Sequence, residues 1–198
     1  PAATTINAGT VNQTIWSRNL SVGTRVGKLH ALTVKMIGSA PVNTLANVKL
    51  FVDGTQVSTA VVDASGYVNF DLSASPLSLT TGSHIVDVRA DVVGGANRNF
   101  YMVLEQASDI RLEDSQVPGA FVTVTTNSGS SAINLAGGTV TVNNGTLTVT
   151  QDTSFSNTTK LVGGSSNVKM AAYKLTAYGE DVKVTSLTFT PTFSGLTP

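Results

Sequence analysis

Hydrophobic and polar residues alternate along most of the chain, and this alternation predicts β-strands. Between residues 85 and 92, Val86, Val88 and Ala90 alternate with charged residues, which is the pattern of a strand with one buried face. Further strands are predicted at 11–21, 28–36, 48–52, 56–62, 68–72, 100–104, 121–124, 139–142 and 146–150. Segments with the 3.6-residue period of a helix are absent from the sequence. The chain is therefore predicted to be all-β and to form antiparallel β-sandwich structure.

Two dipeptides predict tight hairpin turns between strands. Asp53-Gly54 and Asn144-Gly145 each lie between two of the predicted strands. A two-residue hairpin turn needs positive φ at both positions, and Asp, Asn and Gly adopt that conformation most readily. We therefore expect a hairpin at both places. Asp53 and also Asp63, in a further predicted turn, are assigned to turn formation rather than to ligand binding.

The segment 159–195 repeats the segment 4–40 without a gap, at an offset of 155 positions (159 against 4). Identical residues at this offset include the pairs Gly9 and Gly164, Asn12 and Asn167, Leu20 and Leu175, Lys28 and Lys183, Leu32 and Leu187, Thr33 and Thr188, and Ser39 and Ser194. In both copies the alternation changes phase, after Leu29 or Val184, which predicts a β-bulge at the same place. Two segments that share such an irregularity are expected to be two copies of one module.

The second copy is expected to be incomplete. The predicted organisation is a complete sandwich at 1–126, a small, polar, glycine-rich linker at 127–138 and a partial module at 139–198. The partial module has no counterpart of the strands predicted between residues 48 and 104, and the first module has none of the strand at 146–150. Three explanations fit: the chain is part of a longer repeat array, a neighbouring subunit supplies the missing strands, or the second module is a smaller sheet docked on the first.

The run GEDVKVTSLTFTPTFSG (179–195), preceded by GSSNVKMAAYKLTA (164–177), resembles tandem Ig-like repeats of bacterial cell-surface and surface-layer-type proteins. In those repeats, such a segment is followed by a strand like LANVKLFVD (45–53) and a DG hairpin, and the first module has this order. The resemblance covers 4–125 as a complete repeat and 139–198 as a partial one. It implies Ig-like sandwiches, an extracellular location and a structural or adhesive role, and it carries over no catalytic residue.

Composition narrows the classes of partner. Charged residues make up 12% of the chain, against about 25% in ordinary soluble domains. Twelve basic and twelve acidic residues give a formal net charge of zero, so binding to nucleic acid or to acidic membranes is not indicated. Cysteine is absent, which excludes disulfides and thiolate metal sites. No apolar run approaches the roughly 20 residues that a membrane-spanning helix needs.

The densest acidic region contains four candidate metal ligands, Glu105, Asp109, Glu113 and Asp114. Loop carboxylates with backbone carbonyls supply the roughly six to eight oxygens that Ca²⁺ takes. The DxDxDG spacing is absent, however, and Arg111 lies within the group. A calcium site and a solvated strand end are the two interpretations, and no other cofactor is expected.

The two histidines and the sequence motifs give no indication of a catalytic site. His30 and His84 are expected at the surface or rim of the sheet, each without a partner carboxylate at ligand spacing, and the common catalytic and nucleotide-binding motifs are absent. The prediction is therefore that the chain is not an enzyme. Glycosylation sequons begin at Asn12, Asn19, Asn144 and Asn157.

The aromatic residues offer one hypothesis of carbohydrate binding. Trp16, Tyr67, Phe100, Tyr101 and Tyr173 would form a sugar-stacking platform only if several of them shared one exposed face. Core packing and isolated surface tyrosines are the expected arrangement, because aromatic residues make up only 6% of the chain.

The function that the sequence favours is a non-catalytic structural protein of the cell exterior. It would self-assemble with identical subunits into a surface layer or filament through its β-sandwich modules, with strand complementation as one mechanism. The alternative is an adhesin module that binds carbohydrate or a host surface.

Overall fold

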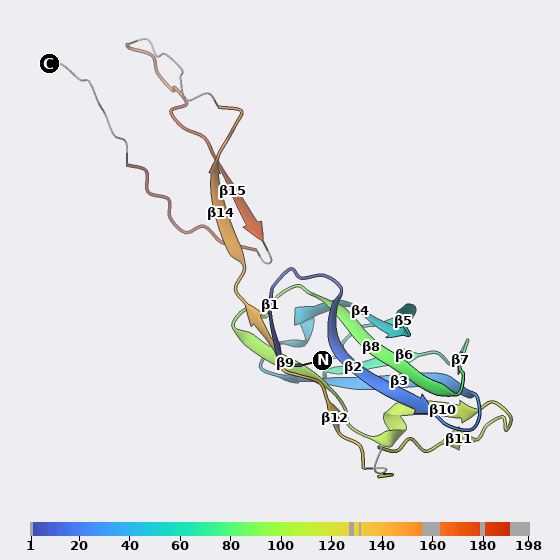
Figure 1. Cartoon of the computed structure of the whole chain (residues 1–198). Coiled ribbons are helices and arrows are strands. Elements are labelled where there is room, and N and C mark those ends of the chain that lie inside the picture. Colours follow the sequence, from blue (N-terminus) through green and yellow to red (C-terminus); the bar gives the residue numbers. More distant parts are fainter. Residues whose placement is uncertain (1, 127–128, 131, 156–162, 179–180, 191–198) are drawn as a thin grey trace.

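A computed structural model describes residues 2–126, 129–130, 132–155, 163–178 and 181–190. Strands make up most of the regular structure. Helical residues in this part of the chain are confined to two 3₁₀ helices, η1 (Val42–Thr44) and η2 (Ala107–Asp109). The predicted all-β class is confirmed. A two-layered sandwich holds most of the strands, and a narrow two-stranded ribbon projects from one end of it (Figure 1).

The smaller layer of the sandwich is a sheet with the strand order β2-β8-β4-β5 in the described chain. Its strands are β2 (Gln13–Val22), β8 (Gly82–Val92), β4 (Leu45–Val52) and β5 (Thr55–Ala60). All its pairings are antiparallel. β2 and β5 are therefore the edge strands of this sheet.

The larger layer follows the order β1-β13-β9-β3-β10-β11, with β6 and β7 beside β3 and β12 beside β9. Its strands are β1 (Thr4–Asn7), β3 (Gly27–Gly38), β6 (Tyr67–Asp71), β7 (Leu77–Leu79), β9 (Arg98–Leu104), β10 (Ile110–Asp114), β11 (Phe121–Val122), β12 (Leu135–Ala136) and β13 (Val140–Asn143). Both sheets turn one apolar face inward, as alternating strands must.

The core between the sheets consists of the apolar positions that the alternation predicted. Val88 on β8 is fully buried, and so are Phe70 on β6 and Phe100 on β9. Trp16 and Leu50 complete the interior from the side of the smaller sheet, with 1% and 0% of their surface exposed. Burial of large apolar side chains is the main stabilising contribution in such a layered fold.

The hairpin predicted at Asp53-Gly54 is confirmed, whereas the one at Asn144-Gly145 is wrong. Asp53 and Gly54 have φ of 50° and 79°, and they join the paired strands β4 and β5. Asn144 and Gly145 do not have positive φ in the described chain. They lead from β13 in the sandwich to β14 in the ribbon, and these two strands do not pair with each other.

The β-bulge predicted in the first copy is present in β3. Leu29 lies opposite Leu112 of β10, and Ala31 lies opposite Arg111, so His30 is an extra residue on β3. The extra residue shifts the phase of the apolar alternation. Leu29 and Leu32, three residues apart, are therefore both buried on the same face.

Strand pairing places the region around residue 140 in the first sandwich. β13 pairs antiparallel with β9 and parallel with β1, and Val140 and Val142 lie fully buried in the core. β12 pairs with β9 as well. The sequence-based boundary at residue 139 therefore does not coincide with the end of this sheet, which continues to Asn143.

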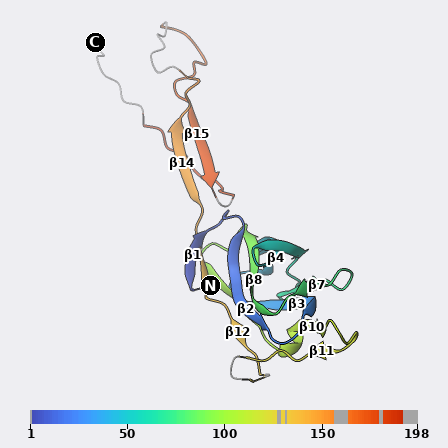
Figure 2. The same ribbon diagram turned by 45° about the vertical axis from the view of Figure 1, so that its right-hand side comes forward.

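The ribbon consists of β14 (Thr146–Gln151) and β15 (Tyr173–Tyr178), which pair antiparallel from Thr146 opposite Tyr178 to Gln151 opposite Tyr173. It points away from the sandwich in both views (Figure 2). Residues 181–190 carry no assigned strand. Of the predicted repeat, residues 159–162, 179–180 and 191–195 lie outside the described residues.

Candidate interaction site

The four carboxylates predicted as calcium ligands are used in separate contacts. Glu105 accepts hydrogen bonds from Lys35 Nζ at 3.3 Å and from Tyr67 Oη at 3.1 Å. Asp109 Oδ2 accepts the backbone N–H groups of Glu105 at 3.0 Å and of Gln106 at 2.8 Å, which caps the short helix η2. Both carboxylates therefore have local structural partners.

Glu113 and Asp114 hold a different part of the larger sheet. Glu113 lies 2.6 Å from His30 Nε2 through Oε2 and accepts the N–H of Gly119 at 2.5 Å through Oε1. These contacts, led by that of Gly119, lower the pKa of Glu113 below its usual value. Asp114 pairs with Arg25 at 3.1 Å. Among the described residues, no group of three or more His, Asp or Glu side chains is placed to hold a metal ion. Calcium binding gains no support from this arrangement.

His84 differs from the sequence-based expectation of an unpartnered surface histidine. Only 8% of the residue is exposed, its Nδ1 lies 2.7 Å from Asp53 Oδ2, and its Nε2 lies 2.8 Å from the carbonyl oxygen of Thr80. Both partners are acceptors, so the geometry suits the doubly protonated ring, and the pKa of His84 is raised, mainly by Asp53. His30 has a carboxylate partner as well, Glu113. Sequence reasoning missed both pairs because strand pairing brings these residues together across 31 and 83 positions.

The aromatic side chains do not form one exposed platform. Trp16 and Phe100 are buried in the core. Tyr67 and Tyr101 are half-buried on the larger sheet, and Tyr173 lies on the ribbon. Of the sequon asparagines, Asn12, Asn19 and Asn144 are exposed, and Asn157 lies outside the described residues.

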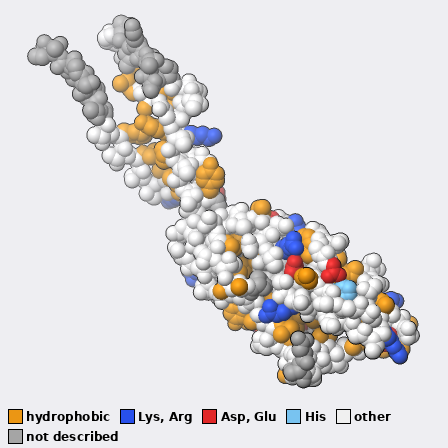
Figure 3. All heavy atoms as spheres, viewed as in Figure 1, with side chains coloured by type: hydrophobic (Ala, Val, Ile, Leu, Met, Phe, Trp, Pro, Cys, Tyr) orange, Lys and Arg blue, Asp and Glu red, His pale blue; other side chains and the backbone are white. Residues whose placement is uncertain are grey.

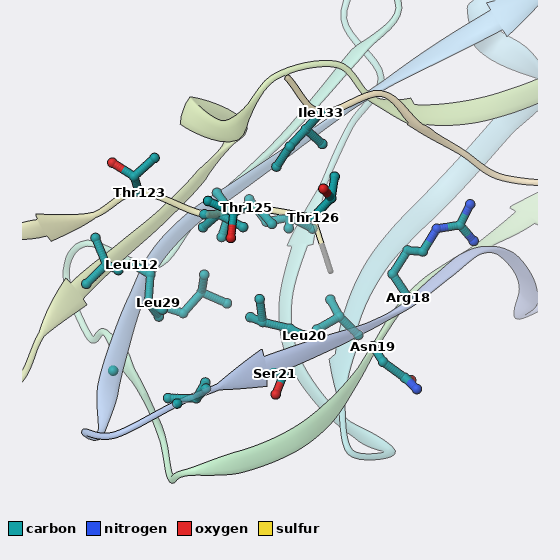
Figure 4. A pocket seen from close by; sticks show the side chains of 18 of the residues that line it. Arg18, Asn19, Leu20, Ser21, Leu29, Leu112, Thr123, Thr125, Thr126 and Ile133 are labelled. Carbon is teal, nitrogen blue, oxygen red and sulfur yellow. The ribbon is translucent and has the colours of Figure 1, made fainter. Parts of the chain in front are cut away.

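A groove of about 580 Å³ lies along β2, between this edge strand and the segment 122–126 (Figure 4). Leu20, Leu29, Leu112 and Ile133 line it from both layers of the sandwich, whereas the side chain of Arg18 points away. Polar side chains also line the groove, among them Thr123, Thr125 and Thr126. A groove of mixed polar and apolar lining beside an unpaired strand edge is suited to an extended peptide that adds a strand.

Two side-chain hydrogen bonds join β2 to β12 beside this groove. Trp16 Nε1 donates to the carbonyl oxygen of Leu135 at 3.0 Å, and Arg18 Nη2 donates to the carbonyl oxygen of Ala136. β2 ends its sheet, so within the described chain its outer edge carries no paired strand.

The C-terminal part of the chain, described at 146–155, 163–178 and 181–190, exposes a series of apolar side chains (Figure 3). Its exposed large hydrophobic residues are Leu147, Val149, Met170, Tyr173, Leu175, Tyr178, Val182, Val184, Leu187 and Phe189. At the repeat offset of 155, Met170 and Leu187 correspond to Ile15 and Leu32. Met170 and Leu187 are 68% and 59% exposed. Ile15 and Leu32 are only 0% and 1% exposed. The second copy thus leaves uncovered the same positions that form the core of the first.

Comparison of the chain with known protein families, with curated proteins and with solved structures finds no match. The described residues contain no helix long and apolar enough to span a membrane.

Proposed function

We propose that this chain is a structural protein of the cell exterior, built from β-sandwich modules that associate with further β-modules of the same kind into a layer or filament. The observation that carries the proposal is the apolar series on residues 146–190, because positions that are buried in the first copy are exposed in the second. Exposed apolar series of this extent mark surfaces for association.

The ribbon gives a physical reason for association. An isolated two-stranded β-ribbon is marginally stable in water, because it has no second layer to cover its apolar face. Phe189 and Tyr173 are 64% and 50% exposed although their rings lie 6.1 Å apart. Additional strands from another module would bury these side chains and would also pair the ribbon's outer edges.

The surface chemistry of the chain is compatible with close packing of subunits. Its net charge is zero and its content of charged residues is low, so neighbouring copies repel each other little. The resemblance to tandem Ig-like repeats of bacterial cell-surface proteins supports the extracellular location and the absence of catalysis.

The proposal is tested with the full chain by sedimentation velocity over a range of concentrations, followed by negative-stain electron microscopy. We expect association that grows with concentration and produces sheets or filaments. The double substitution Leu187→Ser and Phe189→Ser should weaken it. The matched control is Val11→Ser with Val61→Ser, since these valines are 71% and 79% exposed on the sandwich. A chain that stays monomeric at high concentration would overturn the proposal.

A further inference from the structure

The groove along β2 corresponds to a position that is filled in the second copy. At the offset of 155, β15 matches residues 18–23, which lie almost entirely within β2. β15 pairs with β14. β2 pairs with β8 on one side only, and the groove borders its other edge. The first sandwich therefore has an edge and a partly apolar groove at the place where a strand like β14 would lie.

The pairing of β14 with β15 predicts the register of such a strand. Thr148 lies opposite Thr176, and Thr176 corresponds to Ser21 (176 − 155 = 21). Val149 lies opposite Leu175, which corresponds to Leu20 in the groove. An added strand would thus run antiparallel to β2.

The side-chain pattern of β14 fits the groove in this register. Val149 and Leu147 alternate with threonines, and residues opposite each other on an antiparallel pair share one face of the sheet. Val149 would therefore face the groove beside Leu20, and Leu147 beside Val22, both of which line it. The threonines would face outward with Ser21, which is exposed.

We propose that the groove along β2 binds a β-strand, and that its occupant is β14 of a second copy of this chain. The inference rests on the proposed function and specifies the contact through which the copies associate. β14 would exchange its place in the ribbon for one in the groove. The gain is burial, because Val149 and Leu147 are 57% and 41% exposed in the ribbon.

The contact joins two different parts of the chain. The donor strand lies in the ribbon and the acceptor groove lies in the sandwich, so each copy offers one of each. Such head-to-tail contacts continue from copy to copy and produce an open filament unless the rotation closes a ring.

Engineered cysteines test the register directly, because the native chain has none. Full-length Ser21→Cys and Thr148→Cys chains are mixed under oxidising conditions and separated on a non-reducing gel. The Cα atoms of directly opposite residues on antiparallel strands lie about 4.5–5.5 Å apart, within the range of about 4.4–6.8 Å that disulfides span, so a covalent dimer is expected. The control replaces Ser21→Cys with Thr59→Cys, an exposed position on β5 at the opposite edge of the same sheet, and should give no dimer.

A peptide tests the groove itself. The probe is the synthetic peptide GTLTVTQD (145–152), titrated into the full chain while the fluorescence of Trp16 is recorded. Trp16 is the single tryptophan of the chain and lines the groove. A saturable change is expected, and a control peptide with Leu147→Ser and Val149→Ser should bind at least about tenfold more weakly, which is about 1.4 kcal/mol.

The outcomes separate this inference from the proposed function. A specific Ser21–Thr148 dimer supports the inference, even if electron microscopy shows no layer or filament and the proposed function fails. Peptide binding without that dimer overturns a second copy as the occupant. Neither binding nor a dimer, in a chain that still associates, overturns the groove as the contact and leaves the proposed function standing.

Discussion

Gly164 has a φ of 86°, and Gly9, which occupies the corresponding place in the first copy, has a φ of 88°. Three residues later the agreement repeats, because Asn167 and Asn12 have φ of 56° and 52°. Left-handed backbone is uncommon at residues other than glycine. The two copies therefore share positive φ at these two positions, although residues 181–190, which correspond to much of β3, carry no assigned strand.

The repeat supplies a matched pair of substitutions. Leu32→Ala removes a core side chain with 1% exposure and should lower the free energy of unfolding by about 2–5 kcal/mol. Leu187→Ala removes its counterpart, which is 59% exposed, and should cost less than about 0.5 kcal/mol in the dilute chain. Urea unfolding at low protein concentration measures both. An equal loss for the two variants would mean that residue 187 is already packed.

The strands of the sandwich could be predicted from the sequence because period-2 alternation records which face is buried. Val86, Val88 and Phe70 followed this rule without exception. The two hairpin dipeptides show where local reasoning ended. Asp53-Gly54 turned and Asn144-Gly145 did not, because the strand before Asn144 pairs with β9 and β1 instead of with the strand that follows.

The confirmed turn allows a clean test of backbone conformation. Gly54 has positive φ, and a Cβ built on it would meet no atom within 4 Å. Gly54→Ala should therefore cost about 1 kcal/mol through left-handed backbone alone. Gly94 is equally open but lacks positive φ, so Gly94→Ala should be neutral or slightly stabilising. Thermal unfolding of both variants measures the difference, and equal melting temperatures would contradict it.

The side-chain contacts at the candidate site were beyond local reasoning for a similar reason. The sequence placed Glu105, Asp109, Glu113 and Asp114 close together along the chain, but their partners are set by sheet pairing and by turns. Lys35 reaches Glu105 from β3, for example, which no spacing rule encodes. The groove along β2 was likewise hidden, since it depends on which strand ends the sheet.

The capping role of Asp109 predicts how the chain responds to substitution and to calcium. Its Oδ2 accepts two backbone N–H groups, so Asp109→Ala should lower the free energy of unfolding by about 1 kcal/mol. Because these carboxylates already have separate partners, the melting temperature of the native chain should be the same in calcium chloride and in EDTA. A calcium-dependent increase that Asp109→Ala abolishes would contradict this assignment.

The pair formed by buried His84 and exposed Asp53 predicts a pH-dependent contribution to stability. The folded pKa of His84 is raised above its usual 6.5, chiefly by Asp53 and then by the carbonyl of Thr80. This contribution is therefore complete below about pH 6.5 and is lost as the pH rises through the folded pKa. The pKa of Asp53 is lowered below 3.8, mainly by His84. Its contribution is complete above about pH 3.8 and is lost as the pH falls through the folded value.

The pair should thus stabilise the fold most between about pH 4 and 6.5. Urea unfolding of the native chain and of His84→Gln, at pH 5.5 and at pH 8.5, measures this. Both chains share every other titratable group, so subtracting their free energies isolates the pair. The difference should be larger at about pH 5.5 than at about pH 8.5, and Asp53→Asn should reduce it at the lower pH. A difference that is constant across this range would mean that His84 stays neutral, with one of its two hydrogen bonds unmade.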